Sequence, residues 1–184
     1  MPTPFNENIA KRVLHKLRAI HRVLTTQSPL QTKENLFVDA DHIRIDSIPK
    51  MPPESSTAII NKHFPEDEGG TGWISMVRNN ADSDGKEWVA LKNFQTKWTH
   101  SSDDLDNEMM GEFISPKYGR GYTVRVFDDK NNKIPYFEYH FNYDTGVLIF
   151  DSPQQFPCDD ANNTVKISVY RYCGKHLSDT LNKA

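Results

Sequence analysis

The amino-acid sequence predicts a mainly β protein, with an antiparallel β-sandwich-like body and an N-terminal amphipathic helix that forms an arm. Three observations predict this fold class. Apolar and polar residues alternate with period two in several short runs of the C-terminal third. Turn-forming Asp, Asn and Gly residues separate those runs. Apolar residues recur at steps of three and four near the N-terminus, where a helix is therefore expected.

The expected helix starts near Pro4, which suits a first helical turn, and ends before Pro29. Its apolar residues form one stripe: Ile9, Val13, Leu17, Ile20 and Leu24. Its opposite face is basic: Lys11, Arg12, Lys16, Arg18 and Arg22. Burying the five stripe residues would stabilise a docked state by roughly 7–15 kcal/mol before entropy costs. We therefore predict that the stripe mediates docking or oligomerisation.

The basic face has two other conceivable uses, and both rank below packing of the stripe. Lys and Arg side chains bind nucleic-acid phosphates, and a basic amphipathic helix can lie on a membrane. The stripe is narrow and aliphatic, which disfavours membrane insertion. The chain as a whole carries a net charge of −3, so overall basicity is absent. We expect neither nucleic acid nor a membrane as partner.

Four segments are expected along the chain. Residues 1–48 form the arm, with the helix and short strands, and residues 49–53 form a linker rich in proline. Residues 54–176 form the β body, and residues 177–184 form a polar tail.

Within the body, the middle third is expected to hold short strands and one short helix over residues 101–113. The last third is expected to hold about four strands, at residues 122–126, 137–143, 147–150 and 165–171. In the second of these, Phe137, Tyr139, Phe141 and Tyr143 are expected to share one buried face.

Composition bounds the class of function. Hydrophobic residues make up 36% of the chain, a low fraction that suggests either an extended shape or surface that is buried on assembly. Basic residues gather in the predicted helix, and acidic residues gather between Thr99 and Ser115. This separation of charge suits contacts between copies or with a partner.

Two widely spaced cysteines, Cys158 and Cys173, predict neither a disulfide framework nor a metal site. The sequence contains no apolar run of membrane-spanning length, and its start lacks the apolar core of a signal peptide. We therefore expect synthesis in the cytosol.

Several short motifs resemble catalytic or metal sites, and each has a simpler interpretation. Asp144-Thr145-Gly146 spells the aspartic-protease triplet, but it lies between two strand-like runs and is typical of a hairpin turn. Asn80–Gly85 matches the first half of a calcium loop, yet the twelfth position is Leu91, where a bidentate acid is needed. The seven histidines lack zinc-ligand spacing. We expect no cofactor, no metal and no enzyme activity.

Two alternatives to a structural role stay open. A carbohydrate- or receptor-binding module would use Trp73, Trp88, Trp98 and the strand tyrosines as stacking platforms, and exposed tryptophans would favour it. A glycan hydrolase would need a carboxylate pair, for which Glu108 and Glu112 on the expected short helix are the candidates.

The C-terminal third resembles a β module of tailed-bacteriophage virion structural proteins. The similarity covers residues 118–176, and it is carried by the hairpin run from Phe141 to Phe150, FNYDTGVLIF, and by Tyr170–Gly174, YRYCG. Asn142 stands where the family pattern has Asp. The resemblance implies a virion component of the tail, neck, baseplate or capsid, assembled in the host cytoplasm. It implies other virion proteins as partners, a homo-oligomer and no catalytic residues.

Overall fold

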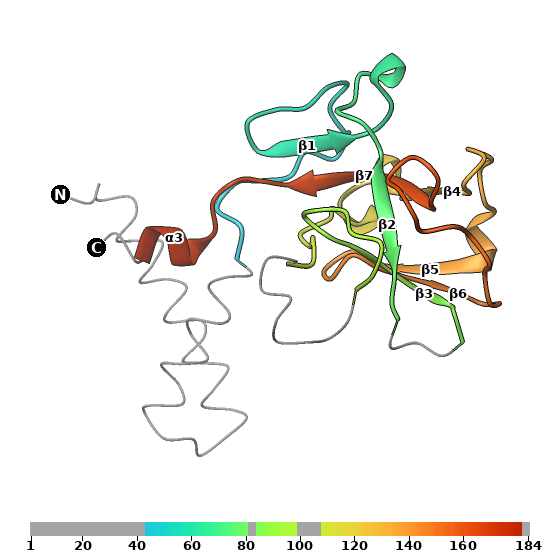
Figure 1. Ribbon diagram of the computed structural model, residues 1–184. Helices are drawn as coiled ribbons and strands as arrows, with labels where there is room; N and C mark the ends of the chain where they lie inside the picture. Colours follow the sequence, from blue (N-terminus) through green and yellow to red (C-terminus); the bar gives the residue numbers. More distant parts are fainter. Residues whose placement is uncertain (1–42, 81–83, 99–107, 182–184) are drawn as a thin grey trace, which may run out of the picture. The chain divides into compact units, whose positions relative to one another are not determined.

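The computed structural model describes residues 43–80, 84–98 and 108–181 (Figure 1). The predicted arm helix, with its apolar stripe and basic face, lies outside the described residues. The chain divides into two compact units, one over residues 48–173 and a smaller one over residues 1–47 and 174–184.

The larger unit is built on one antiparallel sheet of seven short strands. They are β1 (Ile60–His63), β2 (Ile74–Arg78), β3 (Glu87–Ala90), β4 (Arg125–Phe127), β5 (Tyr139–Asn142), β6 (Val147–Phe150) and β7 (Lys166–Tyr172). The sheet follows the order β1-β7-β2-β3-β6-β5, and β4 pairs separately with β7. The predicted mainly β, antiparallel fold class is confirmed, in the form of a curled sheet.

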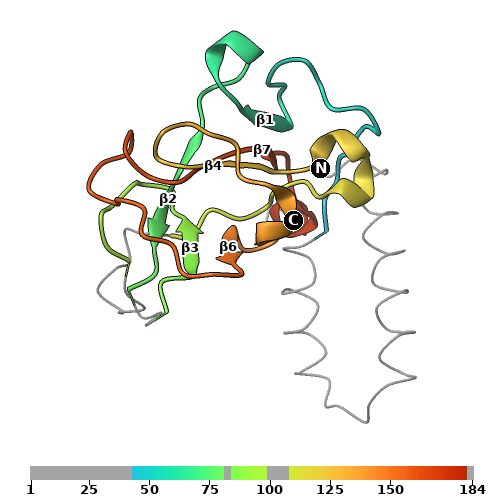
Figure 2. The ribbon, with the colours of Figure 1, turned by 90° about the vertical axis from the view of Figure 1, so that its right-hand side faces the viewer.

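Strand β7 is the centre of this sheet. Its C-terminal half pairs with β1, from Ile60 opposite Tyr172 to His63 opposite Val169. Its N-terminal half pairs with both β2 and β4, and Figure 2 shows β4 alongside it. A strand with partners along its whole length is shielded from water, and six of its seven residues are buried.

Both faces of β7 contact a hydrophobic cluster, which the predicted two-residue alternation did not anticipate. Val165, Ile167 and Val169 face the main core, which includes Trp88 and Phe150. The alternate face contributes Tyr170 and Tyr172 to a second cluster, whose other members are Ile60, Phe64, Ile114 and Tyr122. A smaller third cluster surrounds Val77, Val89, Leu91 and Trp98.

The segment after residue 107 is extended where a helix was predicted over residues 101–113. Residues 99–107 lie outside the description, but from residue 108 the prediction is wrong. Leu91 bridges to Met109 and Phe113 bridges to Arg171, both antiparallel. The Phe113 N–H also donates to the carbonyl of Tyr143. Long-range backbone bonds to β3, to β7 and to the residue after β5 replace the local helical bonds. Glu112 also takes a positive φ of 65° that a helix excludes.

Short 3₁₀ turns connect the strands: η1 (Glu66–Glu68), η2 (Pro116–Tyr118), η3 (Arg120–Tyr122) and η4 (Tyr136–Glu138). The proline-rich residues 49–53 lie within the larger unit and are bonded to its second cluster. The Pro49 carbonyl accepts a 2.8 Å hydrogen bond from the Tyr122 hydroxyl, and the Pro53 carbonyl accepts one of 3.5 Å from Tyr170.

In the smaller unit, the described residues hold a helix, α3 (Leu177–Leu181), within the segment expected to be a polar tail. Arg44 bridges to His176 in antiparallel fashion, and the Leu177 N–H donates to the Ile43 carbonyl. The Asp179 carboxylate accepts the His176 N–H at 2.8 Å, which satisfies a donor just before the helix.

Candidate interaction surface

The hairpin of β5 and β6 presents the candidate functional surface. Its turn forms as the sequence predicts: Gly146 takes a φ of 72°, and its N–H donates to the Asn142 carbonyl. The Asn142 side chain also accepts the N–H groups of Asp144 and Thr145 at 3.0 and 3.2 Å. Asp144-Thr145-Gly146 is therefore a hairpin turn, held by an Asx-type interaction.

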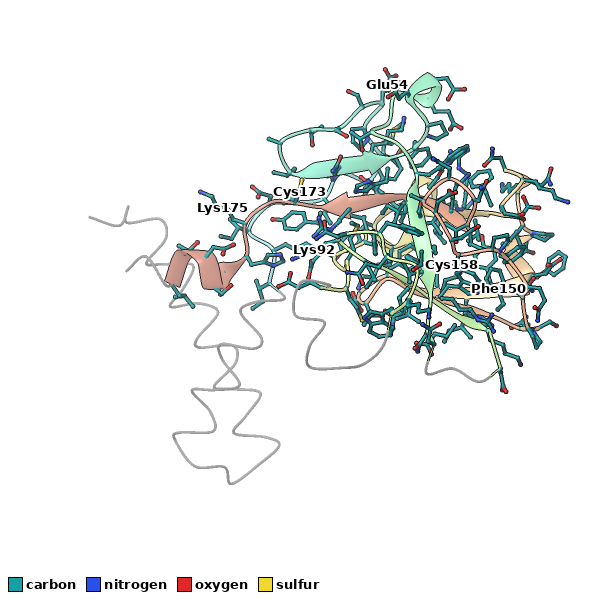
Figure 3. All side chains as sticks on the ribbon, in the orientation of Figure 1. Glu54, Lys92, Phe150, Cys158, Cys173 and Lys175 are labelled. Carbon is teal, nitrogen blue, oxygen red and sulfur yellow. The ribbon has the colours of Figure 1, made fainter. Side chains whose placement is uncertain are left out.

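The hairpin has one face inside the core and one face outside. Tyr139, Leu148 and Phe150 are buried in the main cluster, and Figure 3 labels Phe150. On the other face His140 lies opposite Ile149 in the register, and both are exposed. Ile149 keeps 44% of its surface accessible, which is high for an isoleucine on a strand.

Two aromatic residues stand exposed immediately before β5. Tyr136 is 78% exposed and Phe137 is 67% exposed, and their rings contact each other at 5.7 Å between centroids. The prediction that Phe137 shares the buried face of Tyr139 is wrong. Pro135 has a fixed φ and precedes the 3₁₀ turn η4, so the strand alternation begins only at Tyr139. The Ile134-Pro135 pair in the sequence could have indicated that the strand begins later than predicted.

An open groove of about 410 Å³ lies beside the hairpin. It is lined by hairpin residues between His140 and Ile149, by Ser115, which precedes η2, and by Lys117, which lies in η2. The Ser115 Oγ is buried, and among the residues that the structure describes it has no hydrogen-bond partner. A buried unsatisfied hydroxyl costs on the order of 1–3 kcal/mol, so this atom suits a site that another polar group completes. Sequence reasoning did not identify Ser115, Lys117 or Tyr136, which carry no motif.

Strand β5 ends the sheet and has an open side. In an antiparallel ladder, alternate residues direct their peptide groups to the same neighbour. The carbonyls of Glu138 and Asn142 face β6, because they accept from Asp151 and Gly146. The peptide groups of Tyr139 and Phe141 therefore point away from β6. Among the residues that the structure describes, no backbone group bonds to them on that side.

The charges around the groove are few and accessible. His140 Nε2 lies 3.5 Å from the carboxylate of Asp151, and both side chains are largely exposed. The Lys117 ammonium sits over the Tyr118 ring at 5.4 Å. An exposed ion pair of this type contributes about 0–1 kcal/mol, so the hairpin surface is not held rigid by electrostatics.

The residues considered for other chemistry are placed elsewhere. Trp88 and Trp98 are buried and Trp73 is half-buried against Phe127, so neither Trp88 nor Trp98 offers a stacking platform. Glu108 forms an exposed ion pair with Lys92, and the extended segment removes the helical spacing between Glu108 and Glu112.

The two cysteines are both free thiols. Cys158 contacts the carbonyl of Met76 on β2, and Cys173 lies just after β7 (Figure 3). Across the described ranges, no group of three His, Cys, Asp or Glu side chains is arranged to hold a metal ion. In those same ranges no helix is long and apolar enough to cross a bilayer.

Basic side chains elsewhere contact aromatic rings inside the fold. Arg125 lies 4.5 Å from the centre of the Phe64 ring and bonds the Glu68 carboxylate at 2.6 Å. Lys166, which is buried, lies over Trp73 at 5.2 Å and donates to Asn131. These cations are occupied by internal partners, so we assign this cluster to stability.

Comparison with known proteins gives no relative: no protein family, no curated protein and no solved structure matches the chain.

Proposed function

We propose that this chain is a non-catalytic structural protein of a tailed-phage virion, which self-associates and joins neighbouring subunits of the tail, neck, baseplate or capsid. The proposal begins from the resemblance of residues 118–176. We also propose that the chain is assembled in the host cytoplasm, is located in the virion and has other virion proteins as partners.

The observation that carries the proposal is the exposed apolar surface of the β5–β6 hairpin. Tyr136, Phe137 and Ile149 expose large apolar side chains around this one hairpin. Exposed apolar groups that gather in one place are typical of protein–protein contact sites. The same hairpin carries part of the virion-protein resemblance, so the two arguments concern one element.

The experiment has two readouts. Light scattering of the full chain over a range of concentrations measures self-association, and we expect a discrete oligomer. Mass spectrometry of purified particles, from the phage whose genome encodes the chain, measures incorporation. Absence from intact particles would end the virion proposal. A monomer at every concentration would end the self-association proposal.

The second candidate is a carbohydrate- or receptor-binding module of a fibre. The exposed Tyr136–Phe137 pair favours it, because aromatic faces stack on sugar rings as well as on protein. A glycan array with the full chain tests it. Binding that is lost in Tyr136→Ser and kept in Met51→Ser, an exposed residue elsewhere in the larger unit, would favour this function.

A further inference from the structure

We propose that two copies of this chain associate through antiparallel pairing of their β5 strands about a two-fold axis at His140. This interface rests on the proposed self-association and specifies its surface. The exposed aromatic residues of each copy would enter the groove of the other.

The hydrogen-bonding pattern of β5 is complementary to itself. Tyr139 and Phe141 direct their peptide groups to the open side. With the axis at His140, Tyr139 of one copy lies opposite the partner's Phe141, and the reverse pair forms by symmetry. Each pair can exchange two N–H···O bonds, which satisfies all the open peptide groups of both strands.

The same register places the exposed aromatic residues beside the groove. Residues of β5 whose numbers sum to 280 lie opposite each other, so the strand pairing of each copy ends at the partner's Asn142. Phe137 and Tyr136 precede β5 in the turn η4, and they would leave the strand line close to that end of the partner's hairpin. Tyr143 and Asp144 both line the groove, at the end of the hairpin away from η4. The Tyr136 hydroxyl would then reach the groove that holds the Ser115 Oγ, which has no bonding partner within the described ranges.

The path of the chain agrees with this arrangement. Beyond Phe141, the open side is already occupied at Tyr143, because the Phe113 N–H donates to the Tyr143 carbonyl. A long added strand would collide there. The 3₁₀ turn η4 ends the regular strand at Glu138, so the partner's chain leaves the strand line at that level.

Charge also matches across the axis. Glu138 would be level with the partner's Asn142, which lines the groove together with Lys117. Glu138 and Lys117 are both exposed within one copy. A carboxylate facing an ammonium across the interface favours a second copy of this chain over an unrelated strand.

The first test is a crosslink in the full chain, in a Cys173→Ser background that removes the exposed native thiol. At the axis, facing Cα atoms of a non-hydrogen-bonded pair lie about 4.5 Å apart. His140→Cys should therefore form a disulfide-linked dimer on mild oxidation, because disulfides span this distance. In the matched Asn142→Cys variant the two residues lie about 13 Å apart, and no crosslink should form.

The second test measures association of the full chain by sedimentation velocity. Phe137→Asp should weaken association at least tenfold, and Met51→Asp, at a still more exposed site, should not. Lys117→Glu should weaken association, and adding Glu138→Lys should restore it.

These results separate the interface from the proposed function. Crosslinking at His140 alone, together with weakening by Phe137→Asp, supports the interface. Equal crosslinking at both positions, or no crosslink in a chain that still oligomerises, overturns the interface and leaves self-association standing. A chain that stays monomeric at all concentrations overturns both.

Discussion

At the scale of single residues, the buried polar side chains show how this small β unit fixes its loops. Lys62 is 8% exposed, and its ammonium donates to the carbonyls of Glu54 and Glu68, at 2.7 Å for Glu54. These carbonyls belong to segments before and after β1. One lysine therefore joins the segments on either side of β1, the strand that pairs with β7.

Replacing this lysine should be costly. Lys62→Met keeps the apolar stem and removes both charge-assisted bonds, so we expect a loss of about 2–4 kcal/mol in the free energy of unfolding. Urea denaturation measures it. Lys130→Met, at an exposed position, is the control and should change stability by less than about 0.5 kcal/mol. A similar small change for Lys62→Met would contradict the assigned role.

His63 predicts a dependence of stability on pH. Burial, and then the nearby charge of Arg171, lower the pKa of His63 from 6.5 to about 4. Between these values the unfolded chain binds a proton that the folded chain does not. The free energy of unfolding should therefore fall as pH drops from above 6.5 towards 4, by up to about 3 kcal/mol from this residue.

The measurement compares urea denaturation at several pH values for the native chain and His63→Leu. The His63 Nε2 atom is buried and has no hydrogen-bond partner in the described part of the chain, so leucine removes no bond at this atom. The variant should show a flatter profile between pH 6.5 and 4. Parallel profiles for the native chain and His63→Leu would show that another group causes the dependence.

At the scale of elements, the structure separates what local sequence determines from what distant pairing determines. The hairpin from Tyr139 to Phe150 was predictable, because its alternation and its turn residues lie within a dozen positions. The extended path around Met109 and Phe113 was not, since its partners Leu91 and Arg171 lie far away in the sequence. Helical spacing in that segment was overridden by tertiary pairing.

The candidate surface follows the same division. Ile149 could be assigned to the outer face by strand period, opposite His140. The groove could not be predicted, because Ser115 and Lys117 reach the hairpin only through the pairing of Phe113 with Tyr143. The burial of both faces of β7 likewise depends on the second cluster around Tyr122, and no alternation in β7 itself signals it.

The hairpin turn yields a prediction at this scale. A Cβ at Gly146 would overlap the carbonyl oxygen of Met110, and the φ of 72° is itself unfavourable for alanine. Gly146→Ala should cost roughly 2–5 kcal/mol, as backbone strain and overpacking add. Gly72→Ala is the matched control, because its φ is also positive but no atom of the described residues lies within 4 Å of the added Cβ. It should cost roughly 1–3 kcal/mol. Equal losses, measured by thermal or urea unfolding, would show that contact with Met110 is unimportant.

At the scale of the whole molecule, the chain is expected to carry two separate means of association. One is the stripe from Ile9 to Leu24 on the predicted arm helix, which lies outside the described residues. The other is the proposed β5 interface, in the larger unit. A subunit with two different contacts can join neighbours in more than one direction, which allows assemblies larger than a dimer.

Removing each contact separately should therefore give different masses. We expect the full chain to form an assembly larger than a dimer, and a variant lacking residues 1–28 to stop at the β5-linked dimer. Combining that deletion with Phe137→Asp should give a monomer. Light scattering measures the mass of each, and circular dichroism checks that each keeps its β structure. If the deletion alone gave a folded monomer, association would depend on the arm. If the deletion left the mass unchanged, the stripe would have no part in assembly. The low apolar fraction of the chain would then have to reflect burial of a different surface.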